Sequence, residues 1–164
     1  MIVGNMLRFD PQFDLEAIYR GTEQWVNIGD FTSYSSYTCH DNYFYVFPNN
    51  TGALFFLFIV FKNASLFGIT DFFSVAMVVN VIMVTATMVI TSLICKRRMS
   101  PSAGLLAAAL FLISPSFWLV APVFYTDSLS PAFPASAYYL CHVSENKNGI
   151  LKKCLFYAVF LHLL

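Results

Sequence analysis

The pattern of hydrophobic and polar positions divides the chain near residue 51. Residues 1–51 are mostly polar, whereas apolar stretches with short polar interruptions follow one another from residue 53 onward. The sequence between them, Tyr45-Val46-Phe47-Pro48-Asn49-Asn50-Thr51-Gly52, predicts a turn, because Pro48 favours an extended residue before it and the two asparagines favour turn geometry. Since the polarity of the chain changes here, we expect this turn to lie at a membrane surface.

One segment of the polar half has helical periodicity. Apolar side chains recur at helical spacing up to Gly29, which is a stop signal, so the pattern predicts an amphipathic helix over 15–28. This helix is too polar to span a bilayer and, with Trp25 among its apolar side chains, is typical of a helix that lies on a membrane surface. The following segment, 30–47, is rich in Ser, Thr and Tyr and predicts a polar loop.

The apolar half contains several candidate membrane helices. Residues 72–95 carry no charge and form about 36 Å of helix, which is enough to cross a hydrocarbon core of about 30 Å. Residues 52–67 are apolar but short and contain Lys62, so they predict either a short membrane helix or a juxtamembrane helix. Further transmembrane helices are predicted over 102–122 and over 128–143. Residues 151–164 are predicted to form the beginning of another one.

The composition identifies an integral membrane protein. Hydrophobic residues make up 58% of the chain and charged residues only 11%, whereas ordinary soluble domains carry about 25% charged residues. We therefore expect an all-α membrane protein with several transmembrane helices, bound to a lipid bilayer. The formal net charge is zero, so nucleic acid is not an expected partner. The four cysteines form neither a CxxC pair nor a Cys/His ligand pattern, and we expect no metal site and no cofactor.

The basic residues orient the predicted helices. Lys96-Arg97-Arg98 follows the first clear span, and a second basic group, Lys147, Lys152 and Lys153, follows two spans later. Two spans return the chain to the side of the membrane from which it started, so both groups lie on the same side. The positive-inside rule assigns that side to the cytoplasm. Asp127 then lies outside. If residues 52–67 stay at the surface, the loop over 1–51 is external as well and Asp14 shares the outer face with Asp127. If residues 52–67 span the membrane, the two carboxylates lie on opposite sides. We expect the first arrangement.

Several short motifs occur in a characteristic order. An Asp opens the amphipathic helix, a Tyr-x-x-Pro-Asn-Asn turn follows, a charge-free span ends in basic residues, and Tyr-Thr-Asp-Ser follows the next span. This order resembles the GT-C glycosyltransferases and is most similar to bacterial membrane enzymes grouped with the protein O-mannosyltransferases, glycosyltransferase family 39. The resemblance covers nearly all of the chain but only the N-terminal part of such an enzyme, and Phe47 stands where the family more often has Tyr. We therefore expect an N-terminal fragment that is inactive alone.

The resemblance implies a transferase at the outer face of a bacterial plasma membrane. It would move a sugar from a polyprenyl-phosphate donor to the hydroxyl of an acceptor that the sequence does not identify. Asp14 matches the family's essential acidic residue of the first external loop and would be the general base; Asp10 is the alternative if the register differs. The expected substrate-binding residues are Asp127, Tyr45, Asn49, Asn50 and Tyr125.

The residues alone leave other interpretations open. Asp14 also suits a helix cap, because its carboxylate would accept hydrogen bonds from the first-turn amides. Asp127, together with Ser128, could cap the helix that begins there. A fragment of a transporter or channel with Asp127 as a ligand, or a non-enzymatic membrane subunit, would have the same gross pattern. A transporter would be expected to show paired repeats of broken spans, and no internal repeat is visible.

Overall fold

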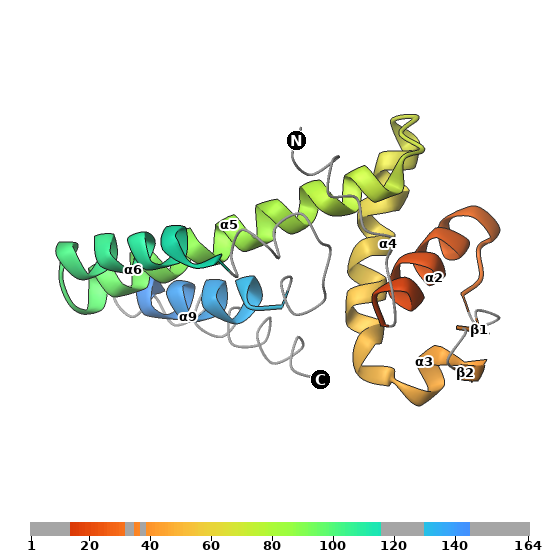
Figure 1. Cartoon of the computed structure of the whole chain (residues 1–164), viewed down its shortest axis with the longest axis horizontal. Coiled ribbons are helices and arrows are strands. Elements are labelled where there is room, and N and C mark those ends of the chain that lie inside the picture. Colours follow the sequence, from red (N-terminus) through yellow and green to blue (C-terminus); the bar gives the residue numbers. More distant parts are fainter. Residues whose placement is uncertain (1–13, 32–34, 37–38, 116–129, 145–164) are drawn as a thin grey trace. The chain divides into compact units, whose positions relative to one another are not determined.

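The computed structural model describes residues 14–31, 35–36, 39–115 and 130–144 (Figure 1). The described part is helical apart from one short two-stranded ribbon, so the helical character that the sequence predicted is confirmed there. Its elements, in chain order, are α2 (Asp14–Ile28), β1 (Ser35–Ser36), β2 (Cys39–Asn42), α3 (Tyr43–Val46), the 3-10 turn η1 (Pro48–Asn50), α4 (Thr51–Leu66), α5 (Phe72–Arg98), α6 (Pro101–Ile113) and α9 (Ala132–Ser144).

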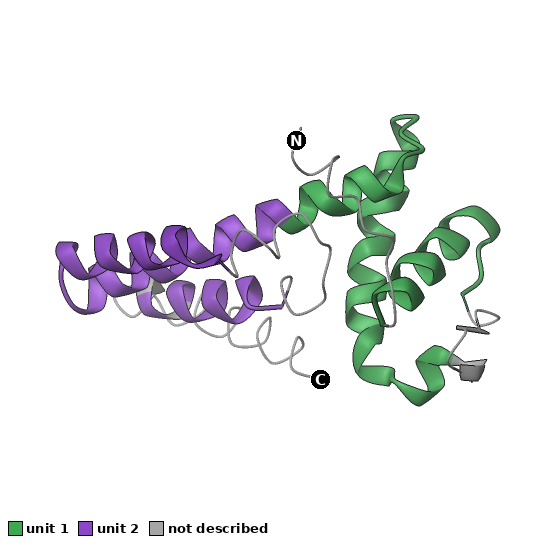
Figure 2. Ribbon diagram, viewed as in Figure 1, with its two compact units in different colours: residues 1–80, 122–126 green, residues 81–121, 127–164 purple. Residues whose placement is uncertain are grey.

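The chain divides into two compact units, which Figure 2 colours separately. Unit 1 comprises residues 1–80 and 122–126, and unit 2 comprises residues 81–121 and 127–164. The boundary falls within α5, so the beginning of this helix belongs to unit 1 and the remainder belongs to unit 2.

The core of unit 1 is built on the packing of α2 against α4. Each helix buries one face, with buried side chains three or four residues apart, as expected of an amphipathic helix on a core. The two helices come close at Gly21 of α2. A Cβ atom at this position would stand 2.9 Å from Cε2 of Phe44 and 3.4 Å from Cδ1 of Leu54, so the missing side chain makes room for both neighbours.

Aromatic rings extend this core to the start of α5. Tyr19 of α2 meets Phe61 of α4 edge-on, with ring centroids 5.8 Å apart, and meets Phe73 of α5 edge-on at 6.2 Å. Phe61 also stacks on Phe72 at 4.9 Å. Because such aromatic pairs contribute about 0.5–1.5 kcal/mol each beyond area burial, the first turn of α5 is an integral part of the core of unit 1.

The ends of the helices in unit 1 follow from their local sequence. Gly29 adopts φ +83° directly after α2, which is the left-handed conformation that the predicted stop signal requires. Asp71 precedes α5 and accepts two hydrogen bonds from Ser74, one from the backbone N–H at 3.2 Å and one from the hydroxyl at 2.5 Å. This arrangement caps α5 and places a carboxylate at the positive end of the helix dipole.

The segment over 30–47, for which the sequence predicted a polar loop, contains regular structure. The strands β1 and β2 pair antiparallel, and the single turn of α3 follows at once. Tyr43 and Phe44 of α3 are buried, and Phe44 meets Phe31 edge-on with centroids 5.7 Å apart. The sequence pattern did not reveal α3, because four residues are too few for helical periodicity to become visible.

Unit 2 contains the rest of α5 together with α6 and α9. The hydroxyl of Ser100 caps α6 by accepting a hydrogen bond from a first-turn amide at 3.1 Å, and Pro101 occupies the first helical position, where its missing N–H costs nothing. The helix ends where Ser114, the residue before Pro115, adopts an extended conformation.

Among the described residues, α5 is the one helix that is long and apolar enough to cross a membrane. It covers the predicted span over 72–95 and continues to Arg98. The shorter apolar helix α6 lies at the start of the predicted span over 102–122, and α9 overlaps the span predicted over 128–143. Two predicted segments lie outside the described residues, namely the C-terminal part of 102–122 and all of 151–164.

Candidate functional site

Asp14, the first residue of α2, is connected to the 3-10 turn η1 through the side chain of Tyr43. Tyr43 of α3 donates a hydrogen bond from its hydroxyl to Oδ1 of Asp14 at 2.7 Å. The same hydroxyl accepts a hydrogen bond from the side-chain amide of Asn50 at 2.6 Å, and Asn49 donates to the Asn50 side-chain oxygen at 3.3 Å. These four residues therefore form a continuous hydrogen-bonded chain, which we call the Asp14 relay.

The hydrogen bonds of the Asp14 relay all run in one direction. Asn49 donates to Asn50, Asn50 donates to Tyr43, and Tyr43 donates to Asp14. Hydrogen bonds arranged head to tail polarise one another, so each donor strengthens the next one along the chain. The carboxylate at the end receives a charge-assisted hydrogen bond, which is about twice as strong as a neutral one.

The position of the Asp14 relay combines a buried support with an accessible end. The side chain of Tyr43 is only 1% exposed, and its ring packs against Phe44 at 5.2 Å and Phe47 at 5.0 Å between centroids. Asp14, in contrast, is exposed. A buried hydroxyl thus fixes one carboxylate oxygen, while the carboxyl group itself stays open to solvent and to a molecule arriving from it.

The helical position of Asp14 adds a second electrostatic feature. Asp14 is the first residue of α2, and the N-terminal turn of a helix carries a partial positive charge that favours a carboxylate. The capping interpretation and a role as a base are compatible, because a carboxylate has two oxygens and several lone pairs. One oxygen accepts the hydrogen bond from Tyr43, and the exposed group retains the capacity to accept a proton from a bound hydroxyl.

The structure brings together three of the residues that the sequence singled out. Asp14, Asn49 and Asn50 all belong to the Asp14 relay. Tyr45, also expected to bind substrate, lies in α3 and is 84% exposed. The remaining predicted site residues, Asp127, Tyr125 and the alternative base Asp10, lie outside the described residues.

The sequence pattern does not single out Tyr43, the residue that connects the others. It lies 29 positions after Asp14 in the chain, and no spacing rule links the two. The available signal was weak: a tyrosine shortly before the turn, in a segment with several other tyrosines and serines. Its importance depends on the packing of α3 under α2, which places its hydroxyl between the carboxylate and the turn.

The described residues hold no group of three or more His, Cys, Asp or Glu side chains that could bind a metal ion. The side chains of the Asp14 relay are a carboxylate, a phenol and two amides. Comparisons of the chain with protein-family models, with curated proteins and with solved structures gave no match.

Proposed function

We propose that this protein is part of a multi-pass membrane glycosyltransferase of the GT-C type, with Asp14 as its general base. The donor is a polyprenyl-phosphate sugar, whose lipid tail stays in the bilayer while the sugar is presented at the outer surface of a bacterial plasma membrane. Asp14 takes the proton from the acceptor hydroxyl as the hydroxyl oxygen attacks the anomeric carbon. The bond from that carbon to the donor phosphate breaks, and the polyprenyl phosphate leaves with the electron pair.

The observation that carries this proposal is the Asp14 relay. A general base has to be accessible to its substrate and held in a defined orientation, because proton transfer needs a heavy-atom separation of about 2.6–3.2 Å. Asp14 is exposed and is oriented by the buried Tyr43 hydroxyl at 2.7 Å. The amides of Asn49 and Asn50 lie on the same relay and have the hydrogen-bonding capacity to contact sugar hydroxyls.

The surface of α4 supports the placement of this site beside a membrane. The helix has 16 residues, or about 24 Å, which is shorter than a hydrocarbon core of about 30 Å. One face is buried in unit 1, whereas Phe55 and Leu66 are 54% and 76% exposed and Lys62 is exposed among them. A helix with one face on a folded unit and a second apolar face that includes a lysine suits a juxtamembrane position. On this basis we propose that α4 does not cross the bilayer.

The test of Asp14 is its substitution by asparagine in the full-length parent protein. Asp14→Asn preserves the side-chain shape, an oxygen that can accept from Tyr43 and the capping ability, since Asn caps helices about as well as Asp. It removes the base. Turnover should fall by about 10²–10⁴-fold, or roughly 3–5 kcal/mol. The measurement is the release of polyprenyl phosphate from labelled polyprenyl-phosphate mannose in membranes that contain the protein.

The matched control is Asp71→Asn, which changes the same residue type at the start of another helix. Asp71 caps α5 and is not one of the four relay residues, so this variant should turn over the donor normally. If Asp14 were only a helix cap, Asp14→Asn would be nearly silent and Asp14→Ala would cost only about 0.5–2 kcal/mol of stability. Normal turnover in a folded Asp14→Asn protein would remove Asp14 from the mechanism.

A further inference from the structure

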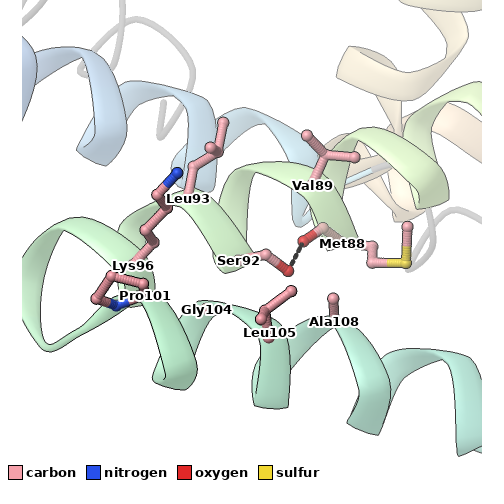
Figure 3. A pocket seen from close by; sticks show the side chains of 9 residues that line it. All are labelled: Met88, Val89, Ser92, Leu93, Lys96, Pro101, Gly104, Leu105 and Ala108. Atoms are coloured by element: carbon pink, nitrogen blue, oxygen red, sulfur yellow. Dashed lines mark hydrogen bonds between the residues drawn. The ribbon is translucent and has the colours of Figure 1, made fainter.

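A groove in unit 2 lies between the C-terminal half of α5 and the N-terminal half of α6 (Figure 3). Its volume is about 350 Å³, which is in the range of pockets that hold small ligands. The walls are mainly aliphatic, with Met88, Val89 and Leu93 on α5 and Leu105 and Ala108 on α6. Lys96 completes the lining at the end of the groove that is nearer the C-terminus of α5.

Two local features keep the groove narrow and apolar. α6 approaches α5 closely at Gly104, where a Cβ atom would stand 2.7 Å from Cβ of Lys96 and 2.8 Å from the carbonyl oxygen of Ser92. Ser92 contributes a polar side chain to the same part of the lining. Its hydroxyl donates a hydrogen bond to the carbonyl oxygen of Met88 at 2.7 Å (Figure 3). This hydroxyl is therefore satisfied by its own helix, and the adjoining wall presents carbon atoms to a ligand.

The residues near Lys96 are those typical of a membrane–water interface. Lys96 begins the basic triplet that ends α5, and the guanidinium of Arg98 lies 5.7 Å from the centre of the Tyr138 ring in α9. Basic residues at the cytoplasmic end of a span and interfacial tyrosines both mark the level of lipid headgroups. From this level the groove extends along α5 to Met88, about 12 Å deeper into the apolar part of the helix.

We propose that this groove binds an anionic phospholipid, with an acyl chain between α5 and α6 and the headgroup phosphate at Lys96. The aliphatic walls fit the chain, and the lysine at the headgroup level complements the phosphate charge. Basic pockets between membrane helices on the cytoplasmic side are suited to anionic headgroups. The proposal depends on α5 lying in a membrane with its basic end in the cytoplasm. It does not depend on sugar transfer, because no residue of the Asp14 relay lines the groove.

The experiment measures lipid retention by the full chain in detergent, with native mass spectrometry. Phosphatidylglycerol and phosphatidylcholine of matched acyl chains are titrated, and no sugar donor is present. The wild-type protein should bind phosphatidylglycerol several-fold more tightly than phosphatidylcholine. Lys96→Gln should weaken phosphatidylglycerol binding by about fivefold, the effect of one basic side chain near an anionic lipid, and should weaken phosphatidylcholine binding much less, because the choline cation offsets the charge of its phosphate.

Two further variants separate charge from shape. Lys62→Gln, which removes an exposed lysine from the apolar helix α4, should leave the lipid preference as in the wild type. Ala108→Leu adds three carbon atoms inside the groove and should weaken the binding of both lipids. Equal affinity for the two lipids in the wild-type protein, or equal phosphatidylglycerol binding by Lys96→Gln and Lys62→Gln, would overturn the proposal. Lys96→Gln alters an exposed side chain, so the proposal stays testable even if Ala108→Leu fails to fold.

Discussion

At the scale of single residues, the hydroxyl of Tyr43 connects parts of the chain that are far apart in sequence. Tyr43→Phe removes the hydrogen bonds to Asp14 and Asn50 while keeping the buried ring. Because Asp14 is exposed and gains water in exchange, the cost should be about 1–2 kcal/mol rather than that of a fully buried unpaired group. The loss is measured as a decrease in thermal stability. Turnover should also fall, but less than in Asp14→Asn, since the base is kept and only its orientation is loosened.

The control for this variant is Tyr45→Phe, the same substitution two residues further along. The Tyr45 side chain is 84% exposed, so removing its hydroxyl should leave the stability unchanged. If Tyr43→Phe and Tyr45→Phe had equal melting temperatures, the Asp14 relay would contribute nothing to the fold, and its role in orienting the carboxylate would have to be abandoned.

The candidate site could be predicted from sequence only as far as its surface residues. The position of Asp14 at the start of a helix suggests a cap, and the resemblance to the GT-C enzymes suggests a base; Asn49 and Asn50 stand out because they form a turn before an apolar segment. Each of these is a local signal. Tyr43 has no such signal, because its hydroxyl acts only after α3 has packed beneath α2. Residues that link segments through tertiary packing carry no periodic or motif pattern, and a single sequence therefore does not reveal them.

At the scale of elements, two glycines in helices give opposite expectations for one substitution. A Cβ atom on Gly21 would stand 2.9 Å from Phe44, whereas one on Gly52 would meet nothing within 4 Å. Gly52→Ala should stabilise the protein by about 0.4–1 kcal/mol, because alanine restricts the unfolded chain. Gly21→Ala restricts the unfolded chain in the same way, but overpacking against Phe44 should lower the free energy of unfolding by about 1–3 kcal/mol.

The comparison between these two variants tests how tightly α2 packs on its neighbours. The free energy of unfolding of Gly21→Ala should be lower than that of Gly52→Ala by about 1–3 kcal/mol, as measured by chemical denaturation in the same detergent. Phe44 cannot move aside freely, since it is buried against Phe31 and Tyr43. Equal stabilities would mean that the contact between α2 and α3 is loose in solution.

The helices were predictable where periodicity or apolar runs extend over several turns. α2 and α5 begin within one residue of the starts expected for 15–28 and 72–95. The ribbon formed by β1 and β2 and the short helix α3 were not predicted, because segments of two to four residues are too short to show a two-residue or a 3.6-residue period. α5 continues beyond residue 95 because Lys96, Arg97 and Arg98 are good helix formers at the negative end of the helix dipole.

At the scale of the whole molecule, the proposed topology places Asp14 and Asp127 on one side of the membrane. It is tested with single cysteines in a cysteine-free background. Ser33→Cys and Thr126→Cys should both react with a membrane-impermeant thiol reagent added from outside, and Met99→Cys, next to the basic triplet, should react only after permeabilisation. Labelling at position 126 without labelling at position 33 would mean that α4 crosses the membrane, and the two aspartates could not share a site.

The aromatic contacts of Tyr19 have a consequence for the biosynthesis of the protein. Its ring packs on Phe61 of α4 and on Phe73 at the start of α5. Since synthesis proceeds from the N-terminus, α2 cannot complete its packing before residue 73 has left the ribosome. The residues emerging next are those of α5, the helix suited to partition into the bilayer. If α5 enters a bilayer as proposed, completion of the core of unit 1 and insertion of α5 would both require the residues at the start of this helix.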